Sequence, residues 1–388
     1  MSSEEWKKVN LGNFACIKTG KLNSNAAEIE GIYPFFTCSP ETYRINSFAF
    51  DCEAAILAGN NANGIFCLKY YKGKFNAYQR TYIITTDPEK ADIKFVYFQL
   101  DLRLSRLKNI SHGTATKYLT LPLLNEIEVN LPSVKTQQRI VEILSALDDK
   151  IELNRQTNAT LEAIAQAIFK EWFVDFNYPD ATGEMAESQL GMIPKGWRVG
   201  NLGEEGEFKN GINYSRDEGG DAEYSIANVR NIVANKFVVS ANLDKINANV
   251  NKATPYLLER QDILIARSAS PGNASLVYET YENVIFSGFT IRYRLPKKEY
   301  TMFLFLLLQT IREKLEDLAN GTTLKSINQA SLRAVQIVIP DVKIILDFNA
   351  VIIPLYDQIV QNQTEEAVLS QIREQLLPEL MSGRLELR

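Results

Sequence analysis

Residues 135–173 constrain the fold of this chain more than any other stretch. Apolar and amide side chains recur there at alternating steps of four and three, at Ile140, Leu144, Leu147, Ile151, Asn154, Asn158, Leu161, Ala165, Ile168 and Trp172. This seven-residue repeat predicts a helix that packs along its length against another helix. No proline or glycine interrupts it, so the helix would extend roughly 55–60 Å. Because that length exceeds the core of a small domain, the helix needs a partner.

The partner lies in the same chain, 208 residues further on. Adding that offset gives Phe348, Ile352, Leu355, Ile359, Asn362, Glu366, Leu369, Arg373, Leu376 and Leu380. Seven of these ten residues are apolar, and Asn154 falls on Asn362. We expect the two helices to pair antiparallel as an intramolecular coiled coil. If the centres of the repeats oppose each other, Asn158 faces Asn362 as a buried register-fixing pair; a solvated helix edge is the alternative for each asparagine.

The duplication extends beyond the helices. The offset of 208 relates Gly64, Gly113, Thr114, Lys117, Pro132, Val134 and Lys135 to Gly272, Gly321, Thr322, Lys325, Pro340, Val342 and Lys343. Nearer the N-terminus the offset is 191, and it relates Trp6, Leu11 and Gly12 to Trp197, Leu202 and Gly203. The difference predicts an insertion in the second copy. The chain is thus predicted to comprise block 1 (1–133), a long helix (134–176), a linker (177–196), block 2 (197–340), and a second long helix with its tail (341–388).

Each block mixes strand and helix patterns, which predicts an α+β fold. Two mixed α/β domains would be separated by two long antiparallel helices, in a tandem repeat with approximate two-fold symmetry. Runs rich in Ile, Val, Tyr and Phe predict strands at 48–58, 81–85, 127–131, 263–266, 289–295 and 335–339. Short helices are expected at 94–109 and 300–319. Residues 174–196 are aperiodic and hold prolines and glycines, so we expect a plain connector there.

Composition excludes several classes of site. The four cysteines form no CxxC pair and His112 is the only histidine, so no metal site is predicted. The N-terminus lacks the apolar core of a secretion signal. The longest apolar run, 302–308, is far shorter than the roughly 18–20 residues that cross a bilayer. A soluble, cytoplasmic protein with no membrane contact is expected.

The net charge of −5 is uneven along the chain. Block 1 has 15 Lys and Arg against 13 Asp and Glu, and block 2 has 17 against 16, so the acidic excess lies in the helices and linker. Near-neutral blocks permit contact with DNA, with a partner supplying further phosphate contacts. Two blocks on a stiff spacer suit a duplex, where half-sites are read at separations that the protein fixes. Because the blocks differ in sequence, the half-sites would differ too.

The chain resembles the specificity (S) subunits of type I restriction–modification systems over essentially its whole length. The resemblance rests on LGMIPKGW at 190–197, the Gly-Thr loops before each final strand, LPS at 131–133 with QQRIV at 137–141, and Leu377, Leu380, Met381, Ser382 and Gly383. It implies that each block is a target recognition domain for one half of a bipartite double-stranded DNA target. It also implies that the helices set the spacing and dock two modification (methyltransferase) subunits, and that restriction subunits complete the nuclease. The second helix lacks the paired glutamines, so docking at that end follows less directly.

The resemblance implies no cofactor on this chain, with S-adenosylmethionine and Mg/ATP on the partner subunits. The sequence agrees, since it has no Asn-Pro-Pro-aromatic or Asp-Pro-Pro-aromatic tetrapeptide, no GxGxxG and no complete phosphate loop around Gly20-Lys21. No catalytic residues are predicted, which disfavours an enzyme. A coiled-coil scaffold that bridges proteins without touching DNA remains the alternative.

Candidate DNA contacts lie mainly after predicted strands. Asparagine can read adenine and arginine guanine through paired hydrogen bonds, and lysine suits phosphate. The candidates are Lys18, Thr19, Lys21, Asn60, Asn61, Asn63, Lys69, Tyr70, Lys72 and Lys117 in block 1, and Lys209, Asn210, Arg267, Ser268, Ser270 and Lys325 in block 2. The alternatives are solvated turns and loops, and a hairpin tip for Lys69, Tyr70 and Lys72. The Gly-Thr pairs are expected to be structural.

Overall fold

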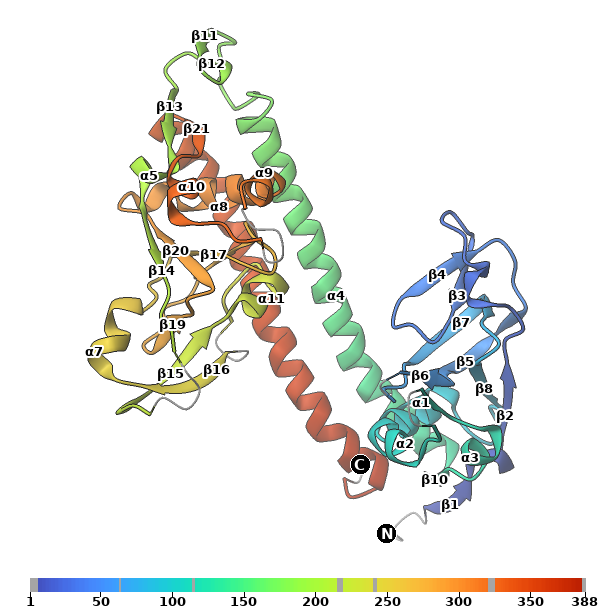
Figure 1. Cartoon of the computed structure of the whole chain (residues 1–388). Helices are drawn as coiled ribbons and strands as arrows, with labels where there is room; N and C mark the ends of the chain where they lie inside the picture. The colour runs from blue at the N-terminus through green and yellow to red at the C-terminus, as the bar shows by residue number, and fades with distance from the viewer. Residues whose placement is uncertain are drawn as a thin grey trace. The chain divides into compact units, whose positions relative to one another are not determined.

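The computed structural model describes residues 6–62, 64–113, 116–214, 219–239, 243–319 and 325–385 (Figure 1). The chain divides into two compact units. Unit 1 comprises Met1–Gln156 and Asn362–Arg388, and unit 2 comprises Thr157–Gln361. Each unit contains one block and a part of both long helices. These units differ in kind from the five predicted segments, so the predicted division into five segments stays a prediction.

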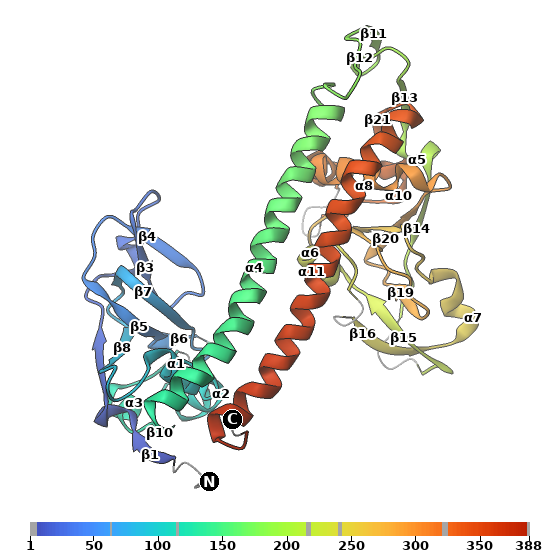
Figure 2. The same ribbon diagram turned by 180° about the vertical axis from the view of Figure 1, so that it is seen from behind.

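The two long helices are α4 (Val134–Phe173) and α11 (Val342–Ser382). Both bounds agree with the repeat to within one residue at each end. The helices lie side by side in opposite directions, as Figures 1 and 2 show, and the predicted antiparallel pair is confirmed.

In unit 1 the start of α4 packs on the end of α11. Ile140 and Leu144 share a cluster with Leu377, Leu380 and Met381, which also includes two phenylalanines of block 1. Arg373 on α11 donates to Asp148 on α4 at 2.6 Å and to Asp101 of block 1 at 3.0 Å. These contacts join the block to both helices.

In unit 2 the end of α4 packs on the start of α11. Ala165, Phe169 and Phe173 share one core with Ile345, Phe348, Ile352, Tyr356 and Ile359 and with the sheet of block 2. The rings of Phe173 and Phe348 are 4.7 Å apart and nearly perpendicular. Lys236 of block 2 donates to Glu162 of α4 at 2.5 Å.

The predicted helix-pairing positions differ in burial. Nine are buried, namely Ile140, Leu144, Ile151, Asn154, Asn158, Phe348, Ile352, Ile359 and Asn362. Six are half-buried, namely Leu147, Leu161, Ile168, Leu355, Leu369 and Leu376. The neighbours Phe169, Tyr356 and Leu377 are buried instead. A straight helix drifts about 20° per heptad, so the inward face moves off a strict seven-residue repeat.

The three heptad asparagines are buried. Asn154 donates to the backbone oxygen of Asn362 at 3.4 Å and to Glu365 at 2.8 Å. Asn158 donates to the backbone oxygen of Ile359 at 3.5 Å. Because these bonds reach particular turns of α11, slipping the helices by one turn would break them. The facing of Asn158 and Asn362 joins two units and stays a prediction.

Block 1 is built on a six-stranded sheet in the order β2-β8-β5-β7-β3-β4. Its strands are β2 (Ala15–Thr19), β3 (Tyr33–Phe36), β4 (Thr42–Ile45), β5 (Phe50–Ala58), β7 (Leu68–Ala77) and β8 (Thr81–Thr86). Two short pairs complete the block, β1 (Lys7–Asn10) with β10 (Glu128–Leu131) and β6 (Asn60–Asn61) with β9 (Lys117–Tyr118). Residues 54–58 of the interior strand β5 are buried on both faces, which explains their continuous apolar run.

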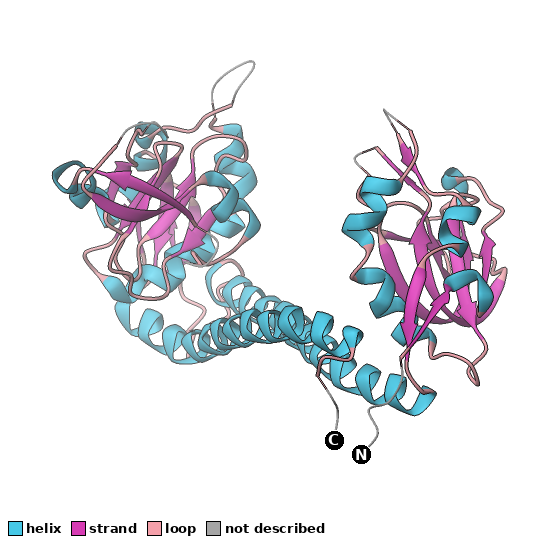
Figure 3. Ribbon diagram, turned by 90° about the horizontal axis from the view of Figure 1, so that it is seen from below, coloured by secondary structure: helices cyan, strands magenta, loops and turns pink. Residues whose placement is uncertain are grey.

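Block 2 has a four-stranded sheet and a three-stranded sheet. The first, β14-β20-β17-β18, consists of β14 (Glu207–Asn210), β17 (Ile263–Ala266), β18 (Ala274–Leu276) and β20 (Thr290–Arg294). The second, β16-β15-β19, consists of β15 (Ala222–Ala227), β16 (Asp244–Ala248) and β19 (Val284–Phe286). A short pair joins β13 (Arg198–Asn201) to β21 (Gln336–Ile339). Figure 3 shows strands and short helices in both blocks, which confirms the α+β class.

Strand register confirms the repeat. Lys7 pairs with Leu131 in block 1, and Arg198 pairs with Ile339 in block 2. These pairs are related by the offsets 191 and 208 at their first and second members. The predicted insertion of block 2 lies in the region that contains β15 and β16 together with α6 (Val229–Ala234) and α7 (Val250–Ala253).

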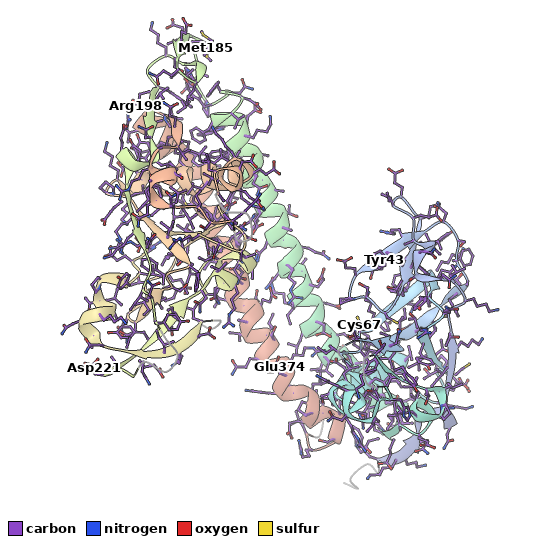
Figure 4. The ribbon with its side chains drawn as sticks, in the orientation of Figure 1. Tyr43, Cys67, Met185, Arg198, Asp221 and Glu374 are labelled. Carbon is purple, nitrogen blue, oxygen red and sulfur yellow. The ribbon has the colours of Figure 1, made fainter. Side chains whose placement is uncertain are left out.

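Three sequence expectations need correction. The helix predicted at 94–109 is two helices, α1 (Ile93–Asp101) and α2 (Leu104–Ile110). The one predicted at 300–319 is likewise α8 (Thr301–Thr310) and α9 (Arg312–Asp317). The linker holds a hairpin, β11 (Met185–Ser188) with β12 (Gly191–Pro194). Gly191 there has φ +96°, which favours the turn; Figure 4 labels Met185 in this hairpin. Each block also contains further short helices, α3 (Leu121–Asn125) in block 1 and α5 (Leu202–Glu205) and α10 (Gln329–Arg333) in block 2.

Helix α11 is the one helix of the described residues that is long and apolar enough to cross a membrane. Its most apolar 18-residue stretch has a mean hydropathy of 1.3, and 28% of that stretch is buried. Polar residues interrupt this stretch, so the longest unbroken apolar run of the sequence, 302–308, lies elsewhere. Helix α11 packs on α4 and on block 2. A helix with apolar contacts on more than one side has a similarly apolar composition.

Candidate nucleic-acid interface

The candidate loops of block 1 meet at a junction after strand β5. Gly59 donates its N–H to the carbonyl of Arg80 at 2.8 Å and accepts from the N–H of Leu119 at 2.8 Å. Immediately after it, Asn60 pairs with Tyr118, and Asn61 pairs with Lys117. The backbone therefore holds three distant segments together.

A fourth segment of block 1 joins the same place. Gly20 donates its N–H to the carbonyl of Thr81 at 3.2 Å. A Cβ on Gly20 would lie 2.0 Å from the carbonyl oxygen of Ala77, so only glycine allows this close approach. We call the region formed by 20–21, 59–61, 80–81 and 117–119 junction 1.

Block 2 repeats this backbone arrangement after strand β17. Arg267 donates its N–H to the carbonyl of Phe289 at 3.0 Å and accepts from the N–H of Ile327 at 2.9 Å. Ser268 forms an antiparallel bridge with Ser326. Since Asn60 and Tyr118 become Ser268 and Ser326 on adding 208, the two pairings are equivalent.

The glycine loop of block 2 is also equivalent. Gly211 donates its N–H to the carbonyl of Thr290 at 3.1 Å, and a Cβ on it would lie 2.2 Å from the carbonyl oxygen of Ser287. We call the region formed by 210–211, 267–270, 289–290 and 325–327 junction 2. The two junctions share their main-chain bonds and differ in their side chains.

Several predicted residues are brought together at these junctions. In block 1 they are Lys21, Asn60, Asn61 and Lys117, and in block 2 they are Asn210, Arg267, Ser268, Ser270 and Lys325. Lys21 and Lys325 are exposed, and Asn60, Asn61 and Lys117 are half-buried. Asn63, Thr114 and Thr322 lie outside the described residues.

The segment 267–270 is a tight turn. Ser270 donates its N–H to the carbonyl of Ser268 at 2.8 Å, and Ala269 has φ +63°. The side chain of Asn273 donates to the carbonyl of Ser270 at 3.2 Å. The Arg267 guanidinium donates to the carbonyl of Gly288 at 3.5 Å, which is a long bond that leaves most of its donors for another partner.

Lys18, Thr19 and Lys209 lie in strands where loops were expected. Lys18 and Thr19 are the last residues of β2, and Lys18 pairs with Ile83. The exposed Lys18 side chain lines a cavity of about 510 Å³ together with Asp51 and Glu53. Lys209 is inside β14, where its ammonium donates to the carbonyl of Pro255 at 3.0 Å.

The cluster Lys69, Tyr70 and Lys72 does not lie at a hairpin tip, which was one of the two interpretations made from the sequence. Its contact with the DNA backbone stays a prediction. The three residues lie within β7, away from any hairpin tip. Lys72 forms an ion pair with Glu53 at 3.0 Å, and the Tyr70 hydroxyl donates to the same carboxylate. Burial, and next the hydrogen bond with Glu53, raises the pKa of Tyr70.

Lys69 is likewise held within the block. Its ammonium donates to the carbonyl of Glu41 at 2.8 Å and to the Thr42 hydroxyl at 3.1 Å, and burial lowers its pKa. A DNA contact by Lys69, Tyr70 or Lys72 would have to break these contacts, so the cross-strand partners favour a structural role.

The sequence missed three side chains at the junctions. They are Arg80, which is exposed, Tyr118, which is 45% exposed, and Phe289, which is 65% exposed. Phe289 was assigned to a predicted strand. The signal that could have found it is Gly288, because glycine commonly marks a turn, which favours a turn position for Phe289 before the strand begins.

The chemistry available at the junctions is that of recognition. Amide, hydroxyl, guanidinium and ammonium groups can bond base edges and phosphates. In the part of the chain that the structure describes, no group of three or more His, Cys, Asp or Glu could hold a metal ion.

Two stretches, residues 3–163 and 194–372, match the profile of the type I restriction modification DNA specificity domain. The chain belongs to this family. It is accordingly a specificity subunit of a type I restriction–modification system, a non-catalytic member of a complex that binds DNA.

Relatives of known identity agree with this assignment. The chain is 36% identical over 216 residues to the type I restriction enzyme EcoDI specificity subunit of Escherichia coli, covering 50% of this chain and 47% of that protein. It is 29% identical over 312 residues to the MjaIX specificity subunit of Methanocaldococcus jannaschii, covering 78% and 71%. The chain thus aligns with about half of the EcoDI subunit.

The fold also matches a solved structure. The crystal structure of the type I restriction–modification system S subunit from M. genitalium superposes with a TM-score of 0.70, covering 98% of this chain and 97% of that one. The sequence identity is 17%, so this comparison supports the fold alone.

Proposed function

We propose that each block of this specificity subunit reads one half of a bipartite double-stranded DNA target, in the major groove, through its junction. The observation that carries the proposal is the repeated junction. Main-chain bonds position equivalent loops in both blocks. The side chains differ, because Asn60 and Asn61 of block 1 correspond to Ser268 and Ala269 of block 2, next to Arg267. Different hydrogen-bonding groups on one scaffold are what two different half-sites require.

The helices set the spacing between the half-sites. Their pairing is specified by the buried asparagines and by ion pairs, including Lys150 with Glu365 at 3.1 Å and Arg155 with Glu366 at 2.5 Å. A helix pair fixed in register is a spacer of defined length. The half-site separation should therefore be constant for this chain.

The helices also dock two modification subunits. Ile164 on α4 and Ile372 on α11 are 43% and 38% exposed, and the offset of 208 relates them. Leu153, Val368, Leu346 and Val351 add further exposed apolar surface to the two helices. Equivalent apolar residues on a duplicated helix suit two copies of the same partner.

S-adenosylmethionine and Mg/ATP would be bound by the modification and restriction subunits, and a cytoplasmic location is inferred for the complex. The missing second glutamine pair does not weaken docking, because Gln137 has an internal role. Its amide accepts from the N–H of Asp92 at 2.9 Å and donates to the carbonyl of Pro132 at 2.9 Å. The equivalent residue Ile345 is buried in apolar surroundings.

Enrichment from a random duplex library tests the proposal, with the chain alone and with modification subunits. We expect a gapped, two-part motif with one gap length. A library in which no sequence is enriched in either arm would support the protein-bridging scaffold. Methylation or cleavage by the chain alone would contradict the non-catalytic role.

A further inference from the structure

Arg80 and Phe289 occupy the same position of the repeated fold. The carbonyl of each accepts the N–H of the residue that follows the central strand, Gly59 in block 1 and Arg267 in block 2. Register supports the equivalence independently. Ile56 of β5 pairs with Ile83, and its counterpart Leu264 pairs with Arg292. Since Ile83 and Arg292 are each three residues beyond Arg80 and Phe289, the two positions correspond.

This position is the centre of each junction. In block 2, three neighbouring main-chain bonds fix the turn that carries Phe289. Arg267 donates to its carbonyl at 3.0 Å, Gly211 donates to that of Thr290 at 3.1 Å, and the N–H of Thr290 donates to Ser287 at 2.9 Å. The backbone is therefore held on both sides, and the side chain is presented from a fixed base.

The two side chains at this position project outward. Phe289 is 65% exposed and makes no ring contact with any other aromatic side chain of the described residues. Arg80 is exposed, and within the described ranges its guanidinium has no hydrogen bond or ion pair. A phenyl ring left in water forgoes the stabilisation of burial, so a ring fixed at the centre of a polar junction indicates a surface that covers it on binding.

Base edges in the major groove offer a complement to each side chain. The guanidinium of arginine pairs with O6 and N7 of guanine, and phenylalanine contacts the 5-methyl group of thymine. We propose that this matched position is a specificity determinant in both blocks. Arg80 donates to O6 and N7 of a guanine in the first half-site, and Phe289 contacts the methyl group of a thymine in the second. The inference rests on the proposed reading of two half-sites.

The test for Phe289 uses the complex of this chain with modification subunits and duplexes carrying the enriched motif. Replacing the thymines of the second half-site by deoxyuridine removes only methyl groups. We expect about fivefold weaker binding by the parent protein at the contacted base. Phe289→Ala should bind both duplexes equally, and Phe289→Leu should keep part of the difference. The control Val233→Ala alters another exposed apolar residue of block 2 (46% exposed) and should keep all of it.

The test for Arg80 replaces guanine in the first half-site by 7-deazaguanine, which lacks the N7 acceptor. We expect about tenfold weaker binding by the parent protein and no difference for Arg80→Ala. The control Lys90→Ala removes another exposed cation of block 1. Each variant should leave the response at the other half-site unchanged, and all variants should melt at the parent temperature.

The outcomes separate the inference from the function on which it rests. A gapped motif with no thymine in the second half-site or no guanine in the first would overturn the inference alone. So would a variant that stays as sensitive as the parent to the modified base. Absence of any gapped motif would overturn the proposed function itself.

Discussion

Phe348 gives the sharpest test of how the long helices are held in unit 2. Its side chain is fully buried and contacts three aromatic rings of α4, with centroid distances of 6.2 Å to Phe169, 5.7 Å to Trp172 and 4.7 Å to Phe173. Truncating a buried phenylalanine to alanine costs about 3–5 kcal/mol. We place Phe348→Ala in the upper part of that range, because it also removes the edge-to-face contacts.

The matched control is Leu346→Ala. Leu346 lies two residues away on the same helix and is 55% exposed, so its truncation should change stability by no more than about 0.5 kcal/mol. Urea denaturation followed by circular dichroism measures both free energies of unfolding. At about 2–4 °C per kcal/mol, Phe348→Ala should also lower the melting temperature by roughly 10 °C. Equal losses for the two variants would refute the assignment of the inward face of α11.

Three further predictions concern other contacts. Burial raises the pKa of Asp148, and Arg373 opposes that rise. Arg373→Met should raise the pKa of Asp148 further, so the free energy of unfolding of this variant should fall as pH increases from about 4 to 7. Urea denaturation at several pH values measures this dependence. Ile164→Asp and Ile372→Asp should each lose one modification subunit, because a charge cannot be buried in an apolar contact; native mass spectrometry counts the subunits. Gln137→Ala should cost about 1–3 kcal/mol through two unsatisfied backbone groups and leave both subunits bound.

Distinct results would contradict each of these. A penalty for Arg373→Met that is the same at all pH values would exclude coupling to Asp148. Loss of both subunits in one isoleucine variant, or of neither, would show that Ile164 and Ile372 are not separate docking positions. If Gln137→Ala released a subunit without lowering stability, the glutamine would act at the interface and not inside block 1.

The long helices and the repeat could be predicted because they are periodic. The heptad in 135–173 and its copy gave the bounds of α4 and α11 to within a residue, and the two sequence offsets relate the pairing of Lys7 with Leu131 to that of Arg198 with Ile339. A periodic pattern reflects the geometry of the helix itself, which depends on residues that are close in sequence. The gradual turn of the buried face onto Phe169 and Tyr356 needs the actual helix pitch.

The centre of each junction could not be predicted in this way. The carbonyl of Arg80 accepts from Gly59, and that of Phe289 accepts from Arg267, through main-chain bonds. Such bonds do not depend on the type of side chain, so the sequence does not reveal them. The partner of Tyr70 could not be predicted from the sequence for a related reason. Its partner Glu53 lies across the sheet on β5, and a sequence does not show which residues a strand pairing brings together.

The main-chain hydrogen bonds of the junctions have a consequence for how new DNA targets arise. At positions 60, 80, 268 and 289 the main chain makes the bonds that join the loops, so exchanging a side chain there removes none of these bonds. Under the proposed reading of bases by the junctions, mutation can then alter which bases are recognised while the fold keeps its stability. A lineage carrying this architecture can diversify its targets one half at a time, each step passing through a folded protein.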